Sequence, residues 1–303
     1  MRNFIKIIKE ICEESGDIEY TLLSNDWVVK LKKGDTIRYI FGHRFGLNSD
    51  SVDSICSDKY ALSEVLYQNK IPVVRNYMFS SRDIDNVQDN RVYDLLDIYG
   101  AVVCKPINGV SGKDVFVART RNEIDNICNE LYTKYPTIVI CPYFDITNEY
   151  RIIVLNGIIK LMFNKKRQYI VGDGRHTVGA LLDEYRESSS VSILPNTSSL
   201  DKERIPFNNE IVYLNWKHNL KEGSIADTDI PYDVQETLGW LAKDVVDVLD
   251  IKFASVDIIE VDGKYRVLEV NSGVTLEHFS GQSELYYEMA KRVYKSAVHA
   301  LFE

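Results

Sequence analysis

Residues 253–271 read FASVDIIEVDGKYRVLEVN, which is the pattern of two β-strands joined by a turn at Asp262 and Gly263. Side chains of a strand alternate between its two faces. One face of this hairpin is expected to be apolar and to suit a core, with the residues Ala254, Val256, Ile258, Leu268 and Val270. The other face holds polar side chains at positions where a buried hairpin would have apolar ones.

The polar face groups two carboxylates and one amide. If the turn has three residues, 262–264, Asp257 lies opposite Glu269, and Asn271 shares their face. Their oxygen atoms suit Mg²⁺ or Mn²⁺. A turn of two residues would instead put Asp257 and Glu269 on opposite faces. The hairpin alone leaves a metal site and an ordinary hairpin as equal alternatives.

Composition sets the broad class of the protein. The chain has 303 residues, 45% of them hydrophobic and 27% charged, which is ordinary for a globular protein. Its formal net charge of −9 argues against broad binding to nucleic acid or to anionic membranes. Five cysteines without paired spacing suggest reduced thiols, and the N-terminus lacks the apolar run of a signal peptide or a membrane span. We therefore expect a cytoplasmic protein.

A second chemical pattern lies in residues 102–117, VVCKPINGVSGKDVFV. An apolar strand ends in Lys105, and a loop containing Gly109, Ser111 and Gly112 follows. Glycines allow backbone N–H groups to point at an anion, and a lysine at the strand end can reach a phosphate oxygen. The alternative is a hairpin with a flexible tip. A phosphate loop becomes the better interpretation when an acidic metal site follows it, because Mg²⁺ bridges phosphate oxygens.

A third pattern is the basic segment 164–177, NKKRQYIVGDGRHT. Lys165 and Arg167 belong to this segment, which is either a solvated turn or a cationic lid over phosphates or a substrate carboxylate. Just before it, Glu149 is able to accept hydrogen bonds from ribose hydroxyls, and Arg151 is able to reach an anion.

Periodicity predicts a mixed α/β protein with mostly antiparallel strands in its second half. Helices are expected at residues 3–15, 59–69, 122–135, 233–249 and 283–302, with another beginning near 177, and strands at 20–23, 27–32, 36–41, 101–105, 114–118, 137–141, 151–155 and 158–163.

Together these patterns resemble the ATP-grasp superfamily over nearly the whole chain. Four further segments carry the resemblance beside the hairpin: SDKYALSEVLYQNKIPVV (57–74), VVCKPINGVSGKDV (102–115), CPYFDITNEYRIIVLNG (141–157) and VGDGRHTV (171–178). The last segment makes the ATP-grasp modules of cyanophycin synthetase and of fused bacterial glutathione synthetases the most similar group.

The resemblance implies an α+β ATP-grasp fold that holds a nucleotide between two β-sheet subdomains. Its three parts would be a short N-terminal domain (1–58), a central subdomain with the glycine loop (59–143) and a C-terminal subdomain with the metal site (144–303). It further implies ATP and Mg²⁺ as cofactors and assigns roles to residues. The phosphates would be contacted by Lys59, Lys105, Gly109, Ser111 and Gly112, and the base and ribose by Pro142, Tyr143, Phe144 and Glu149. The metal would be held by Asp257, Glu269 and Asn271. Charge would be neutralised during catalysis by Arg151, Lys165 and Arg167.

The implied activity is that of a ligase. ATP would activate the carboxylate of an amino acid or small peptide as an acyl phosphate, which an amine then attacks. The alternatives are a non-catalytic ATP-binding protein with a regulatory or assembly role, and transfer to an acceptor that is not an amine. Some relatives carry an arginine two residues before the metal aspartate, where this chain has Ser255. Relatives also often dimerise, so a homodimer is expected by analogy.

Overall fold

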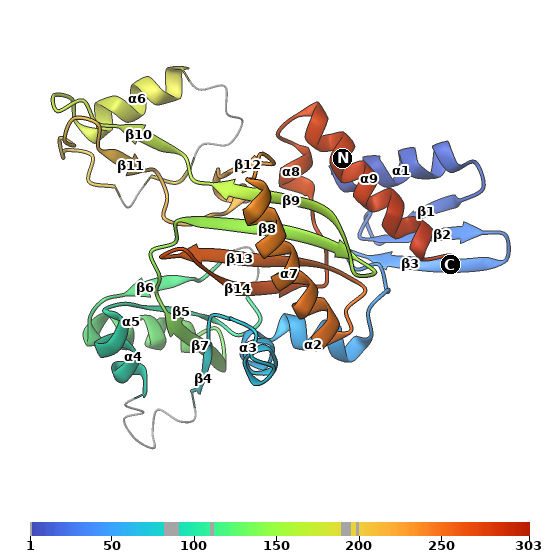
Figure 1. The fold of residues 1–303 in the computed structure, drawn as a ribbon, viewed down its shortest axis with the longest axis horizontal. Coiled ribbons are helices and arrows are strands. Elements are labelled where there is room, and N and C mark those ends of the chain that lie inside the picture. The colour runs from blue at the N-terminus through green and yellow to red at the C-terminus, as the bar shows by residue number, and fades with distance from the viewer. Residues whose placement is uncertain (1, 82–90, 110–111, 189–194, 198–199) are drawn as a thin grey trace.

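The computed structural model describes residues 2–81, 91–109, 112–188, 195–197 and 200–303, and it contains four β-sheets (Figure 1). Two of these sheets, one of five strands and one of four, meet at the centre of the molecule. The expected mixed α/β fold built around two β-sheets is confirmed, and the antiparallel pairing predicted for the second half is present.

The five-stranded sheet has the order β12-β9-β8-β13-β14. Helix α7 (Tyr232–Leu249) crosses one of its faces (Figure 1) and buries Leu238, Ala242 and Val245 against the strands. The apolar residues Ala254, Val256, Ile258 and Val270 face this helix, as the alternation of the hairpin predicts. The strands are β8 (Asn148–Leu155), β9 (Ile158–Lys166), β12 (Ile225–Asp227), β13 (Phe253–Val261) and β14 (Lys264–Asn271).

The four-stranded sheet has the order β4-β7-β5-β6 and packs against α4 (Arg91–Tyr99) and α5 (Arg121–Tyr132). A capping box explains where α5 begins, because Thr120 accepts from the backbone of Glu123 while Glu123 accepts from the backbone of Thr120. The strands are β4 (Tyr77–Ser80), β5 (Val102–Pro106), β6 (Phe116–Ala118) and β7 (Thr137–Pro142).

A short connection after α3 (Lys59–Gln68) ties the two halves together. The backbone of Val267 in β14 donates to Pro72 O at 2.8 Å and accepts from Val74 N at 2.9 Å. Beside this connection an apolar cluster bridges the two sheets, with Cys141 from β7, Ile259 from β13 and Leu268 from β14. The space between the sheets is therefore apolar on this side.

The N-terminal segment packs against the end of the chain. Helix α1 (Asn3–Ser15) lies beside α9 (Glu284–Ala300), with Phe4 and Tyr294 in edge-on contact 5.1 Å apart. Together with α8 (Glu277–Ser280) these helices cover the other face of the large sheet at one end. The remaining elements of this region are β1 (Glu19–Leu23), β2 (Val28–Lys33), β3 (Thr36–Phe41) and α2 (Asp50–Ser57).

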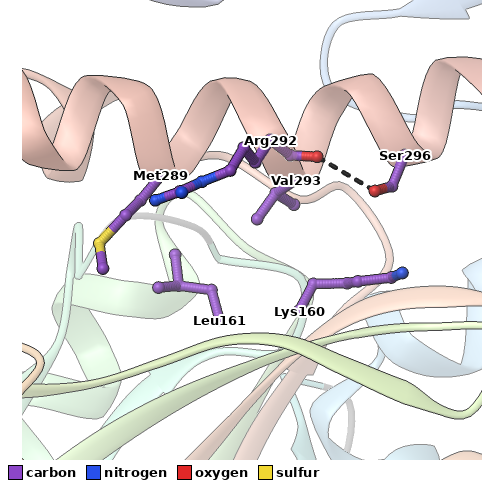
Figure 2. Close-up of a pocket in the computed structure, with 6 residues that line it drawn as sticks. All are labelled: Lys160, Leu161, Met289, Arg292, Val293 and Ser296. Atoms are coloured by element: carbon purple, nitrogen blue, oxygen red, sulfur yellow. Dashed lines mark hydrogen bonds between the residues drawn. The ribbon is translucent and has the colours of Figure 1, made fainter.

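A cavity of about 200 Å³ remains between α9 and β9 (Figure 2). Leu161 and Val293 form its apolar walls, and Lys160 and Arg292 extend along its sides. The hydroxyl of Ser296 is already used, since it donates to Arg292 O at 3.1 Å. The cavity is a packing gap beneath a surface helix.

A small unit projects from the large sheet, as Figure 1 shows. It consists of β10 (Tyr169–Val171), β11 (Ile211–Tyr213) and α6 (Val178–Ser188), and has its own core with Ile170, Leu182 and Leu214. A 3₁₀ helix, η2 (Leu220–Glu222), follows it.

Most expected elements are present with ends shifted by a few residues. Helix α1 and strand β3 have the predicted bounds, 3–15 and 36–41. The sequence reasoning missed α2, α4, α8 and the strands β4, β10, β11 and β12, which are at most nine residues long and have little room for a periodic pattern. The division of the chain at residues 58 and 143 stays a prediction. Within the described part, no helix combines the length and apolar character needed to cross a membrane.

Candidate functional site

The β13–β14 hairpin places Asp257 opposite Glu269, and Ser255 opposite Asn271. The pairing is the expected one, but the expected three-residue turn is wrong. Val261 pairs with Lys264, so the turn contains only Asp262 and Gly263, whose φ angles of 50° and 68° suit the tight turn that Asp-Gly favours.

A β-bulge restores the alignment that a two-residue turn would otherwise lose. Ile258 pairs with Val267, whereas its neighbour Asp257 pairs with Glu269, so Leu268 is an extra residue on its strand. Leu268 consequently leaves the α7 face, where alternation had placed it, and packs in the apolar cluster between the two sheets. Val267 takes its place in the core.

Asp257 is the centre of a buried ionic cluster. Arg151 on β8 donates from Nε to Oδ1 and from Nη2 to Oδ2, both at 2.7 Å. Lys165 on β9 donates to Asp257 Oδ2 at 2.9 Å and also contacts Glu149 Oε1. Neighbouring strands bring these groups together, because Asp257 pairs with Arg151 across the β8–β13 ladder. The sequence reasoning named all four side chains but did not pair them.

Burial and the neighbouring charges shift the pKa values of the groups in this cluster in different directions. Burial acts to raise the pKa of Asp257, but Arg151 and Lys165 outweigh it and hold that pKa well below its usual range. Burial also acts to lower the pKa of Arg151, and Asp257 raises it instead. Burial raises the pKa of Glu149, although Lys165 opposes it. Asp257 is therefore ionised.

The three predicted metal ligands lie on one face but are not equally available. Both oxygens of Asp257 already accept from cations, and Oδ2 accepts from two donors. A carboxylate oxygen has two acceptor positions, so Oδ1 keeps one. The side chains of Glu269 and Asn271 have no hydrogen bond to the residues that the structure describes. These oxygen donors fit Mg²⁺ or Mn²⁺. Within the described ranges, no cluster of three or more His, Cys, Asp or Glu side chains forms a preformed metal centre.

Two lysines approach the same space, one from helix α3 and one from the smaller sheet. Lys59, at the start of α3, donates from Nζ to Gly109 O, and burial lowers its pKa although Glu269 opposes the shift. Lys105, near the end of β5, is only 8% exposed, and its ammonium has no hydrogen bond or ion pair to the described residues. A buried ammonium without a counter-ion is costly, so this position suits an anion.

The Gly112 end of the glycine loop contacts the segment that follows β11. Gly112 O accepts from Lys217 Nζ at 3.0 Å. The φ of Gly112 is 70°, and a Cβ there would lie 3.1 Å from Glu222 Oε1. The positive φ makes a side chain at Gly112 strained, and a Cβ there would also require the end of the Glu222 side chain to shift. Ser111 lies outside the described residues.

The predicted hinge for the base runs along the end of β7. Pro142 is its last residue, Tyr143 lies 6.2 Å from the ring of Trp216, and Phe144 joins the apolar cluster between the sheets. Arg167 belongs with this hinge, because it donates to Ile146 O at 3.2 Å and its guanidinium lies 3.7 Å from the centre of the Tyr213 ring. The structure does not bring Arg167 into the cluster around Asp257.

Residues 215–222 were missed by the sequence reasoning. His218 is buried, its Nδ1 lies 2.8 Å from Lys165 O, and burial lowers its pKa to about 4. Lys217 and Trp216 contact the glycine loop and the hinge. No motif or spacing in the sequence relates this segment to residues more than 70 positions earlier.

No protein-family model matches the chain. The structure is similar to a bifunctional glutathione synthetase from Pasteurella multocida, with a TM-score of 0.57, 18% identity, and coverage of 98% of this chain and 44% of that one. It is also similar to a D-alanine–D-alanine ligase from Bacillus anthracis, with a TM-score of 0.52, 15% identity, and coverage of 82% and 70%. The chain has the ATP-grasp fold.

Sequence relatives place this ATP-grasp chain near the expected group. It is 25% identical over 244 residues to a cyanophycin synthetase from Synechocystis, covering 74% of this chain and 27% of that protein. It is 22% identical over 277 residues to a bifunctional glutathione biosynthesis protein from Listeria monocytogenes, covering 80% and 34%. The expected relationship is confirmed, and the chain spans about a quarter to a third of the length of these curated relatives.

Proposed function

We propose that this ATP-grasp chain is an ATP-dependent ligase that joins the carboxylate of an amino acid or small peptide to an amine. One observation carries the proposal. Lys59 on α3 and Arg151 and Lys165 on the large sheet lie close to the carboxylates of Asp257 and Glu269, and Lys105 of the smaller sheet lies near Lys59. Such an arrangement suits a polyphosphate with its Mg²⁺.

Each side chain has a role in this proposal. Lys105 and the backbone of the glycine loop bind phosphate oxygens, and Lys59 holds Gly109 in place. The hinge at 142–144 and the apolar cluster beside it receive the base. Glu149 has its Oε1 occupied by Lys165, which leaves Oε2 for a ribose hydroxyl. Arg167 is assigned to the hinge and not to the reacting phosphate.

The metal ligands are proposed to be Asp257, Glu269 and Asn271. Bound Mg²⁺ would neutralise the phosphate charge and align the γ-phosphate with the attacking oxygen. Arg151 and Lys165 hold Asp257 ionised and oriented, and the remaining acceptor position of its Oδ1 would be available to the metal. Glu269 and Asn271 need break no contact to bind a metal, since neither side chain has a hydrogen bond or ion pair within the described residues.

The proposed reaction has two balanced steps. A carboxylate oxygen of the substrate attacks the γ-phosphorus and ADP leaves, which forms an acyl phosphate. The amine then attacks the acyl carbon, inorganic phosphate leaves, and the amine loses a proton as the amide bond forms. Acyl phosphates hydrolyse in water, so the site has to exclude it. The contact of Lys217 with Gly112 is suited to closing the glycine loop over the site.

The test is release of ADP over a panel of amino acids and short peptides, with mass spectrometry of the products. We expect one class of carboxylate and amine to give ADP, phosphate and a condensed product in equal amounts. Glu269→Ala should make no ADP, whereas Asp244→Ala, at an exposed position on α7, should be fully active. ATP binding without ADP release for every substrate would favour a regulatory ATP-binding protein instead. Product formation by Glu269→Ala at the wild-type rate would reject the metal assignment.

A further inference from the structure

A polar groove lies on the α7 face of the large sheet, which is the face opposite to the site proposed for ATP. It has a volume of about 430 Å³ and lies between the start of α7 and the ends of β8, β9 and β13. Four polar strand residues line it: Asn148, Tyr150, Asn164 and Glu260. Each is adjacent along its strand to a residue that faces the opposite side of the sheet.

Hydrogen bonds inside the groove leave acceptors in excess. Asn164 Nδ2 donates to Asn148 Oδ1 at 2.7 Å, and Asn148 Nδ2 donates to Glu260 Oε2 at 2.9 Å. Tyr150 donates its hydroxyl proton to the same Oε2 at 3.2 Å. Glu260 Oε1 is not used in this network. Asn164 is only 6% exposed, and its Oδ1 is buried with no hydrogen-bond partner among the described residues.

An orphaned acceptor of this kind points to a donor that comes from outside the chain. A buried polar atom without a partner costs about 1–3 kcal/mol, and nearly all such atoms in folded proteins are paired. The network does not supply this donor, because the bonds from Asn164 Nδ2, Asn148 Nδ2 and the Tyr150 hydroxyl go to other acceptors and none of the described residues donates to Asn164 Oδ1. Asn164 Oδ1 therefore lacks a donor within the part of the chain that the structure describes.

The charge of the groove selects the kind of donor. Glu260 and Asp229 both line it, and Lys166, the cation on its wall, is paired with Asp227. Burial and Glu260 raise the pKa of Tyr150, so this phenol stays neutral. The rings of Tyr150 and Tyr265 lie 6.2 Å apart beside the carboxylate. Carboxylates with aromatic rings form a favourable environment for an organic cation.

We propose that this groove binds a small organic cation with at least one primary ammonium group. The ammonium would donate to Glu260 Oε1 and to Asn164 Oδ1, and the alkyl chain would lie against the ring of Tyr265 and the side chain of Val234. The site is separate from the one proposed for ATP, and the proposal does not depend on the ligase activity.

Putrescine is the probe, titrated by calorimetry against the whole chain at constant ionic strength, with 1,4-butanediol as the uncharged analogue of equal length. We expect saturable binding of one putrescine per chain and none of the diol. Glu260→Gln should weaken putrescine binding by about tenfold or more, the effect of losing one charge-assisted hydrogen bond. Glu269→Ala and Asp244→Asn should bind it as the wild type does.

A second variant keeps the test decisive if Glu260→Gln disturbs folding. Val234→Trp fills the groove from α7 without touching the network around Glu260, and should abolish binding while circular dichroism stays unchanged. The proposal is overturned if the wild type does not bind putrescine, if the diol binds equally well, or if both groove variants bind putrescine normally. Loss of binding in Glu269→Ala would also overturn it, because the cation would then bind in the site proposed for ATP.

Discussion

Arg151 and Asp257 form a two-pronged ion pair across neighbouring strands, with both hydrogen bonds 2.7 Å long. The pair lies in the ladder that joins β8 to β13, so the backbone itself sets the separation of the two side chains. Lys165 adds a third donor to the same carboxylate. Asp257 is thereby held in one orientation before any ligand arrives, which is the preorganisation that phosphoryl transfer requires.

Replacing Arg151 by methionine should affect both stability and turnover. Removing one partner of a buried ion pair typically costs about 3–5 kcal/mol, and Lys165 remains to reduce this loss, so we expect about 2–3 kcal/mol in urea unfolding. ADP release should fall by about 100-fold or more, because Asp257 loses its orientation. Arg121→Met removes an exposed pair with Asp97 and should cost less than about 1 kcal/mol. Equal stability of the two variants would contradict the role given to Arg151.

Lys105→Met should weaken nucleotide binding without lowering stability. Lys105 is buried with no anion beside it among the described residues, so the free chain gains nothing from its charge. A bound phosphate would lose one charge-assisted contact, and the Kd for ATP measured by calorimetry with Mg²⁺ should rise by about tenfold or more. Lys243→Met on α7 is the control. An unchanged Kd together with a lower melting temperature would show that Lys105 is structural.

Gly263→Val should destabilise the hairpin but spare the site. Gly263 has a φ of 68°, which a β-branched residue adopts only with strain of about 1–2 kcal/mol. Thermal unfolding should report this loss, while the affinity for ATP below the melting temperature stays the same, because the bulge at Leu268 and not the turn aligns Asp257 with Glu269. Lys264→Val, at the adjacent strand position, should change stability by no more than about 0.5 kcal/mol. A large loss of ATP affinity in Gly263→Val would mean that the turn sets the register.

Stability should fall on acidification because of His218. Burial lowers its pKa from 6.5 to about 4, so the unfolded chain takes up a proton before the folded one does. This histidine has no effect on stability above pH 6.5 and destabilises the fold progressively as the pH falls from 6.5 to 4. The difference between the pKa of 6.5 in the unfolded chain and about 4 in the folded one corresponds to at most about 3 kcal/mol. His218→Asn should flatten the dependence of unfolding free energy on pH in this window, whereas His299→Asn, at an exposed position, should keep the wild-type slope. Identical slopes for His218→Asn and the wild type would refute this assignment.

Local patterns were enough for several features. The alternation in 253–271 identified a hairpin with an apolar and a polar face, and the spacing of Phe4, Ile7, Ile8 and Ile11 located α1 with its observed bounds. Strand and helix periodicity is a property of neighbouring residues, so it can be read along the chain. The ATP-grasp fold was recognised because several such segments occur in one order, which is also information carried by the sequence.

The tertiary structure decided how these segments cooperate. The hairpin kept Asp257 opposite Glu269 through a bulge and not through its turn, since packing of Leu268 between the sheets outweighs regular alternation. Arg151 and Lys165 became partners of Asp257, and His218 became a buried neighbour of Lys165, through strand pairing and burial that no spacing encodes. The sequence by itself determined which chemical groups the site contains, because residue types and local periodicity are written along the chain. Only the folded chain decided their partners, charges and availability, because those depend on contacts between residues far apart in sequence.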